Sequence, residues 1–267
     1  VTNGGGRLLK QWLSQPLTDI EKLNERLDIV GGFVKNKRLL KKVRFLLDDV
    51  LDIERILGKI SQNKANPRDI IGLKESLKCI PKLQELLQSS DINQLNLAAD
   101  SFADTAPVVE LISEKLNDEV PAQLQQGHVI RDGINKELDE LRKLASGGKR
   151  WIVEMQESER EKTGISKLKV GFNKVFGYYL EISKIHQDKV PESYIRKQTL
   201  VNAERYITEE LKEYEEKILS AEEDILAIES ELFAECCQKI MDRADRIQIN
   251  AKLLNRLDAL STFSHLA

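Results

Sequence analysis

The chain has 267 residues, of which 32% are charged and 5% are aromatic, and its formal charge at pH 7 is −3. This length fits one large domain or two smaller ones, and many charges beside few Gly, Pro and aromatic residues favour long, solvent-exposed helices. The nearly neutral charge excludes a protein that attracts nucleic acid over its whole surface. No apolar run is long enough to cross a membrane, and no signal peptide opens the sequence.

The first half of the sequence predicts a series of amphipathic helices. Thr18 and Glu21 have the spacing of a capping box. Asn66 before Pro67 fits an N-cap with proline at the first helical position. Gly4-Gly5-Gly6 lacks the Lys-Ser/Thr of a phosphate loop, so we interpret it as a linker. Helices are predicted over residues 7–13, from 18 to about 34, 37–47, 50–62, from 66 to Pro81, from Pro81 to about 87, 92–102 and 108–116, before a loop or irregular strand over 118–132.

Two longer helices are predicted in the second half, from Asn135 to Gly164 and from Glu209 to about Asp242. Gly164 is the expected left-handed cap of the first. Each glycine of Gly147-Gly148 costs about 1 kcal/mol against alanine in a helix, so a bend or break is expected there. Only a compact insert separates the two helices, so we expect them to run antiparallel with their apolar stripes facing each other. A last helix is predicted over about 246–266.

The insert, residues 168–206, has a different pattern. Aromatic and β-branched residues are frequent, with Gly and Asn at the breaks, which predicts short strands and tight turns. One hairpin pairs residues 167–172 with 178–183, and a second pairs 194–200 with 203–206. The tip of the second hairpin would be Val201-Asn202, where Asn tolerates the positive φ expected of such a turn.

Positive charge is concentrated around this insert. Residues 149–208 hold about 12 Lys and Arg against about 8 Asp and Glu, whereas the rest of the chain holds about 29 against about 36. A locally basic module on an acidic chain suits contact with a polyanion at one place only. About half of the aromatic residues lie here too, and we interpret them as the small core of the module. The basic residues of the module include Lys167, Lys169, Lys174, Lys184, Lys189, Arg196, Lys197 and Arg205.

Signals for catalysis or metal binding are nearly absent from the sequence. His128, His186 and His265 lie far apart with no evident carboxylate partner, and we interpret them as core or surface residues. The three cysteines have no metal-ligand spacing and are expected to be reduced thiols on helices, with no assigned role for the pair Cys236-Cys237. The acidic clusters after Glu209 are most simply solvated helix faces.

Several ordered stretches of the sequence resemble the lever (core) and clamp domains of the MutS family of DNA mismatch-repair ATPases, in their bacterial form. Together they extend over essentially the whole chain. The matching stretches are Gly6–Leu17, Glu25–Val30, Ile130–Arg142, Glu159–Gly164, Leu168–Tyr179, Arg196–Leu200 and Asn202–Tyr206.

The resemblance implies a mainly α-helical lever, formed by residues 1–148 and 209–267, with a small antiparallel-β clamp inserted over residues 149–208. In the family, two subunits form a ring around duplex DNA, the clamp contacts the DNA backbone irrespective of sequence, and the lever carries conformational change to an ATPase domain. The clamp hairpin contacts of the family correspond to Lys197, Val201 and Asn202, although Val201 departs from the Lys of some relatives. We therefore expect backbone contacts from Arg196, Lys197, Val201, Asn202 and Lys174.

The resemblance also implies a fragment. The mismatch-reading domain, the connector and the ATPase domain with its phosphate loop are not in this sequence. We therefore expect no enzymatic activity and no cofactor in the chain, with ATP and Mg²⁺ bound elsewhere in a dimeric parent protein. The fragment itself is expected to be a monomer, and the parent a cytoplasmic, nucleoid-associated bacterial protein.

Two alternatives remain at this point. A helical scaffold of the structural-maintenance type would need apolar heptads at a strict 3.5-residue period, whereas the long helices here are only loosely periodic. A family branch that acts in meiotic crossing-over shares the lever and clamp domains. The bacterial-style motifs argue against that branch, and the missing N-terminal domain would decide.

Overall fold

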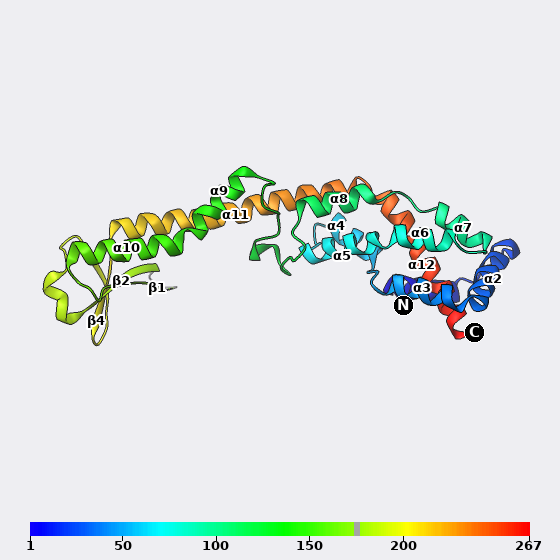
Figure 1. Ribbon diagram of the computed structural model, residues 1–267, viewed down its shortest axis with the longest axis horizontal. Coiled ribbons are helices and arrows are strands. Elements are labelled where there is room, and N and C mark those ends of the chain that lie inside the picture. The colour runs from blue at the N-terminus through cyan, green and yellow to red at the C-terminus, as the bar shows by residue number, and fades with distance from the viewer. Residues whose placement is uncertain (174–176) are drawn as a thin grey trace. The chain divides into compact units, whose positions relative to one another are not determined.

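The computed structural model describes residues 1–173 and 177–267 (Figure 1). They form a mainly helical protein with one small antiparallel sheet, which confirms the predicted fold class. Contacts divide the chain into two compact units: residues 1–131 with 229–267, here called the helical unit, and residues 132–228, here called the sheet unit. The predicted division into lever and clamp domains at residues 148 and 208 is not tested by these contacts, and it stays a prediction.

The helical unit is built around its last helix. α12 (Ala244–Leu266) packs against α1, α2, α3 and α4. Five consecutive residues, 257–261, are buried, as expected for a stretch of helix enclosed by others. The other elements of the unit are α1 (Asn3–Ser14), α2 (Ile20–Lys35), α3 (Lys37–Asp48), α4 (Ile53–Ser61), α5 (Pro67–Lys78), α6 (Ile80–Gln88), α7 (Asn93–Asp100), α8 (Ala106–Lys115), the 3₁₀ turn η1 (Leu124–Gln126) and the second part of α11 (Glu209–Met241).

The N-terminal glycines are helical, so their interpretation as a linker was wrong. α1 begins at Asn3 behind the cap Thr2, whose hydroxyl accepts from the Gly5 N–H at 2.9 Å. At Gly4 and Gly5 the reason is tertiary, because there α1 lies so close to α12 that only glycine fits. A Cβ atom at Gly5 would lie 2.2 Å from a carboxylate oxygen of the buried Asp258.

The two predicted helix starts had different outcomes. α2 is capped by Asp19, whose carboxylate accepts from the N–H groups of Glu21 and Lys22, so the capping box predicted from Thr18 was wrong. The carboxylate one residue later is the better acceptor for these N–H groups, because charge strengthens the hydrogen bond. Asn66 does cap α5, with Pro67 in its first turn, as predicted.

The sheet unit begins with a divided helix. α9 (Lys136–Ser146) ends at Gly147, and α10 (Gly148–Thr163) follows directly, so the predicted break at the glycine pair is confirmed. α10 ends at Gly164 with φ 67°, the left-handed cap that was predicted. α10 lies beside the first part of α11 (Figure 1). Trp151 stacks on Tyr214 with ring centroids 3.5 Å apart.

The sheet has the order β1-β2-β4-β3 with antiparallel neighbours. Its strands are β1 (Lys169–Asn173), β2 (Gly177–Ser183), β3 (Ile195–Thr199) and β4 (Ala203–Ile207), and the 3₁₀ segment η2 (Lys184–Lys189) follows β2. Both predicted hairpins are present, and β2 joins them by pairing with β4. One face of the sheet packs on α10 and α11 through a core of Met155, Ile165, Leu168, Leu180, Ile182, Tyr206 and Leu211.

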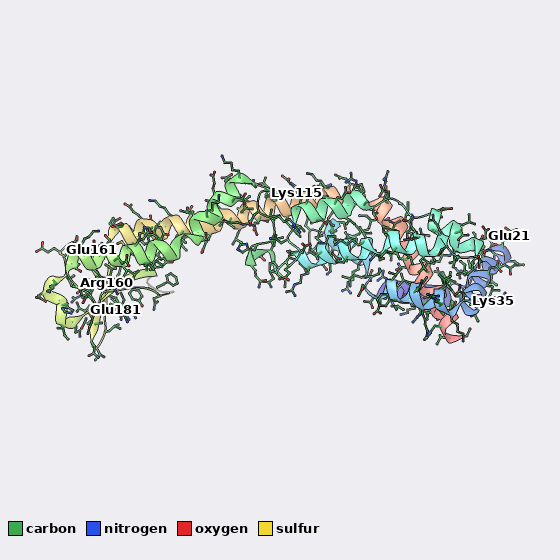
Figure 2. All side chains as sticks on the ribbon, in the orientation of Figure 1. Glu21, Lys35, Lys115, Arg160, Glu161 and Glu181 are labelled. Carbon is green, nitrogen blue, oxygen red and sulfur yellow. The ribbon has the colours of Figure 1, made fainter. Side chains whose placement is uncertain are left out.

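Polar contacts also fix the sheet to α10. The Arg160 Nε atom donates to the Leu168 carbonyl at 2.8 Å, and Figure 2 shows Arg160 on α10 near the sheet. The Tyr194 hydroxyl, directly before β3, donates to the buried Glu159 carboxylate of the same helix. Lys162 also reaches Glu159, at 2.9 Å, and this hydrogen bond raises the pKa of the lysine. The sheet is therefore held to α10 directly before β1 and directly before β3.

Candidate nucleic-acid interface

The β3–β4 hairpin lies at one edge of the sheet and contains a bulge. Arg196 pairs with Tyr206 and Gln198 with Arg205, so Lys197 is an extra residue with no partner opposite. A bulge re-aims a side chain and increases the local twist. β3 is solvent-exposed at every position except the half-buried Gln198. The Lys197 side chain is therefore outside the regular alternation of the strand and open to solvent.

Val201 and Asn202 form the tip of this hairpin. The Leu200 N–H donates to the Ala203 carbonyl at 2.8 Å and closes the turn. The Val201 side chain is 87% exposed. The Asn202 carbonyl accepts from the Lys184 N–H at 3.2 Å and from the Ser183 hydroxyl at 3.4 Å. These bonds attach the tip to the end of β2, so the residue after β2 lies beside the tip.

The expected positive φ at the tip was wrong. In the described part of the chain, the non-glycine residues with positive φ are Asn63 and His128, and neither tip residue is among them. A left-handed turn is favoured where the turn alone must match the twist of its strands. Here the bulge at Lys197 supplies added twist, and the two bonds to Asn202 hold the tip.

Arg196 has a carboxylate partner within the hairpin. One of its terminal nitrogens lies 3.3 Å from Oε1 of Glu204, whose side chain is only 5% exposed. The Tyr206 hydroxyl donates to the other oxygen of that carboxylate. The bond from Tyr206, helped by the charge of Arg196, holds the pKa of Glu204 below its usual range. Burial and this bond raise the pKa of Tyr206 to about 12. Arg196 therefore anchors the hairpin, with its side chain 58% exposed.

Two lysines at the tip have no such partner. The ammonium groups of Lys184 and Lys197 make no hydrogen bond and no ion pair with any residue that the structure describes, and both side chains are exposed. They come from different strands: Lys184 lies directly after β2, beside Asn202, and Lys197 lies in the bulge of β3, four residues before Val201. We define Lys184, Lys197, Val201 and Asn202 as the hairpin tip. It combines two exposed positive charges with an exposed apolar side chain, which suits a polyanion approached at its backbone.

Comparison with known proteins assigns the family. Residues 1–264 match the family described as MutS domain III. The chain belongs to the MutS family. It is 46% identical over 263 residues to the DNA mismatch repair protein MutS of Christiangramia forsetii, covering 98% of this chain and 30% of that protein. It is 44% identical over 264 residues to MutS of Halothermothrix orenii, covering 99% of this chain and 30% of that protein. The chain thus spans about 30% of the length of these curated MutS relatives.

Within this MutS domain, the hairpin brings together three of the five residues predicted to contact DNA. Lys197, Val201 and Asn202 share the tip. Arg196 lies one residue away but is engaged by Glu204. Lys174 lies outside the described residues. Contact with DNA stays a prediction for all five.

Sequence reasoning did not single out Lys184. The signal that could have found it is its place directly after the strand predicted to end at Ser183. That place matters only once β2 is known to pair with β4, because this pairing brings the end of β2 to the tip of the other hairpin. The strand pairs predicted within each hairpin do not give this position of Lys184, because it depends on pairing between the two hairpins.

Arg205, another basic residue of the module, is engaged on the opposite face of the sheet. Its guanidinium lies 4.2 Å from the centre of the Tyr179 ring and donates to Glu181 at 3.0 Å and to Gln198 at 2.9 Å. Tyr179 itself covers Gly171, where a Cβ atom would lie 2.7 Å from the ring. This face is a closed polar and aromatic stack, so the charge of Arg205 is already engaged, in contrast to the lysines of the hairpin tip.

Other kinds of site are not found among the described residues. They contain no group of three or more His, Cys, Asp or Glu side chains placed to hold a metal ion. None of their helices is both long and apolar enough to cross a membrane.

Proposed function

We propose that this chain supplies the clamp and lever part of a DNA mismatch-repair protein, and that its hairpin tip contacts the backbone of duplex DNA without reading sequence. The observation that carries the proposal is the pair of exposed lysines on this hairpin and at the end of β2, Lys197 and Lys184, which form no ion pair within the described part of the chain, together with the exposed Val201. The name that the MutS relatives carry supports DNA as the partner.

The chemistry of the tip favours phosphates over base edges. A lysine ammonium is a point charge with rotatable donors, whereas base recognition uses fixed forks such as that of arginine. The arginine nearest to the tip is held by Glu204. The contacts proposed here would position the protein on the duplex and leave sequence or mismatch recognition to other parts of the parent protein.

We infer a mechanical role for α11. This helix is continuous over 33 residues and contributes to both units, because the division between them falls at residue 228. Its length is about 50 Å at 1.5 Å per residue. An unbroken helix moves as one element, so a force on the sheet unit would be carried into the helical unit along it.

The remaining functions belong to the proposed full-length parent, of which this chain is a part. They are ATP hydrolysis with Mg²⁺, dimer formation and a place in the bacterial cytoplasm near the nucleoid.

The test is the salt dependence of DNA binding. The chain is titrated against a fluorescent 30-base-pair duplex between 50 and 200 mM NaCl, with anisotropy as the readout. Each phosphate contact contributes about 0.9 to the slope of log K against log salt concentration. The double variant Lys184→Ala with Lys197→Ala should therefore lower the slope by about 1.8.

The matched control is Lys217→Ala, which removes an exposed lysine of α11 from the same unit. Its slope should equal that of the unchanged chain. Two duplexes of unrelated sequence should bind equally well. Equal slopes for the double variant and the control, or binding that depends on sequence, would refute the proposed tip contact.

A further inference from the structure

α3 carries a large aromatic side chain on the face turned away from the core of the helical unit. Leu40, Val43 and Leu47 of this helix are buried, whereas Phe45 is 76% exposed. At 100° per residue, Phe45 points about 200° away from Val43. It is therefore not part of the stripe that packs the helix, and burial of α3 does not explain it.

Phe45 borders a hollow of about 630 Å³ formed by α3 and α6. The apolar part of its lining is Phe45, Leu46 and Leu86. A second hollow of about 580 Å³ shares Phe45 and Leu46 and continues toward α5, where Leu51 and Gly72 line it. The second hollow is also lined by Asp49, Glu75, Lys78 and Lys82, so the hollow that combines apolar surface with a net positive lining is the larger one. We call it the α3–α6 groove.

The edge of this groove is positively charged. Lys41, Lys42 and Lys82 line the larger hollow against one carboxylate, that of Glu85. Within the part of the chain that the structure describes, these three lysines form no ion pair or hydrogen bond. α3 as a whole has five basic residues and one acidic residue, although the formal charge of the chain is −3. The charge is thus concentrated on one helix and is not neutralised by its neighbours.

We propose that the α3–α6 groove binds an acidic amphipathic helix of a partner protein. Apolar side chains spaced three and four residues apart would fill the hollow beside Phe45, as in other helix-in-groove complexes. Asp and Glu residues along the flank of that helix would meet Lys41, Lys42 and Lys82. An exposed aromatic residue in an apolar groove is the usual form of an interface anchor.

The lining favours a helix over nucleic acid. Phe45, Leu46 and Leu86 offer apolar surface that a phosphate backbone cannot use. Single-stranded nucleic acid is typically bound by several aromatic side chains on which successive bases stack. The groove has one. The surface is separate from the hairpin tip, so the proposal does not depend on DNA binding there.

The test uses two fluorescein-labelled model helices of 18 residues. Both have Leu at positions i, i+3, i+4 and i+7, and one has Glu and the other Lys on the flanking positions. The Glu-flanked helix should bind the chain saturably with a dissociation constant below about 1 mM, and the Lys-flanked helix should bind at least tenfold more weakly, because each 1.4 kcal/mol is tenfold in affinity. Phe45→Ala should weaken binding of the Glu-flanked helix by about fivefold or more.

Two variants control for folding and for general stickiness. Leu13→Ala removes an apolar side chain of α1 that is 75% exposed and does not line the groove, and it should leave binding unchanged. Charge reversal, with Lys41→Glu, Lys42→Glu and Lys82→Glu combined, should make the chain prefer the Lys-flanked helix. The proposal fails if neither helix binds, if charge reversal leaves the preference unchanged, or if a single-stranded oligonucleotide competes through Phe45.

Discussion

Glu204 controls how much of the positive charge of the hairpin is available. Its buried carboxylate holds Arg196 at 3.3 Å and accepts the hydroxyl of Tyr206. Glu204→Gln keeps the shape of the side chain and removes its charge. Arg196, already 58% exposed, then loses its ionic partner and becomes free to reach a phosphate. We expect the variant to bind duplex DNA more tightly than the unchanged chain at low salt.

The size of the effect follows from one added phosphate contact. Such a contact steepens the slope of log K against log salt concentration by about 0.9. The ratio of the affinity at 50 mM salt to the affinity at 200 mM salt should therefore be about 3.5 times larger for the variant than for the unchanged chain. The assay is anisotropy with the labelled duplex at four salt concentrations. Thermal unfolding, followed by circular dichroism, checks that the variant is folded at the assay temperature.

The control for this prediction is Glu181→Gln. It removes the same charge from the same sheet, but its partner is Arg205, which stays stacked on Tyr179. Its salt slope should stay close to that of the unchanged chain. If the two variants have the same slope, general charge explains the binding, and the reasoning about Arg196 is wrong.

Four other results are expected. Gly5→Ala should destabilise the helical unit by about 1–3 kcal/mol in urea unfolding, because the added Cβ meets the buried Asp258. Gly6→Ala, with open space at its Cβ, should instead stabilise it by up to about 1 kcal/mol, and a loss of stability there would contradict the packing argument. Burial raises the pKa of the thiols of Cys79 and Cys236 to about 11 and that of Cys237 to about 12. At pH 8 the folded protein should therefore react with a thiol reagent more slowly than the unfolded protein. Because these folded-state values exceed the ordinary thiol value, the unfolded state loses its protons first, and the free energy of unfolding should fall as the pH rises above about 8.5; a rise in stability there would contradict the assignment.

The sequence predicted those parts of the fold that depend on local pattern. The break at Gly147, the cap at Gly164 and both hairpins follow from turn and cap residues alone. The helical state of Gly4 and Gly5 does not, because it depends on α12, more than two hundred residues later. Glycine in a helix is unfavourable locally, and only the close approach of α12 explains why glycine occupies these two positions of α1.

The candidate site was predictable in part for the same reason. Positive charge and the tip Val201-Asn202 could be located from composition and turn chemistry. The bulge at Lys197 shifts the register by one residue, and sequence does not predict such a shift. The place of Lys184 depends on pairing between the two hairpins, which local pattern does not predict. Whether a basic residue is available or already paired is therefore a property of the folded sheet.

The most direct test of the central claim is photo-cross-linking from the hairpin tip. The photoreactive residue p-benzoylphenylalanine is placed at Val201, which is 87% exposed, and, in a separate protein, at Leu219 of α11, which is 50% exposed. Both proteins are irradiated with the labelled duplex at 50 mM salt. Our account predicts a protein–DNA cross-link from position 201 that is lost in the Lys184→Ala and Lys197→Ala background, and little from position 219. Equal cross-linking from both positions, or none from position 201 while the duplex is bound, would contradict it.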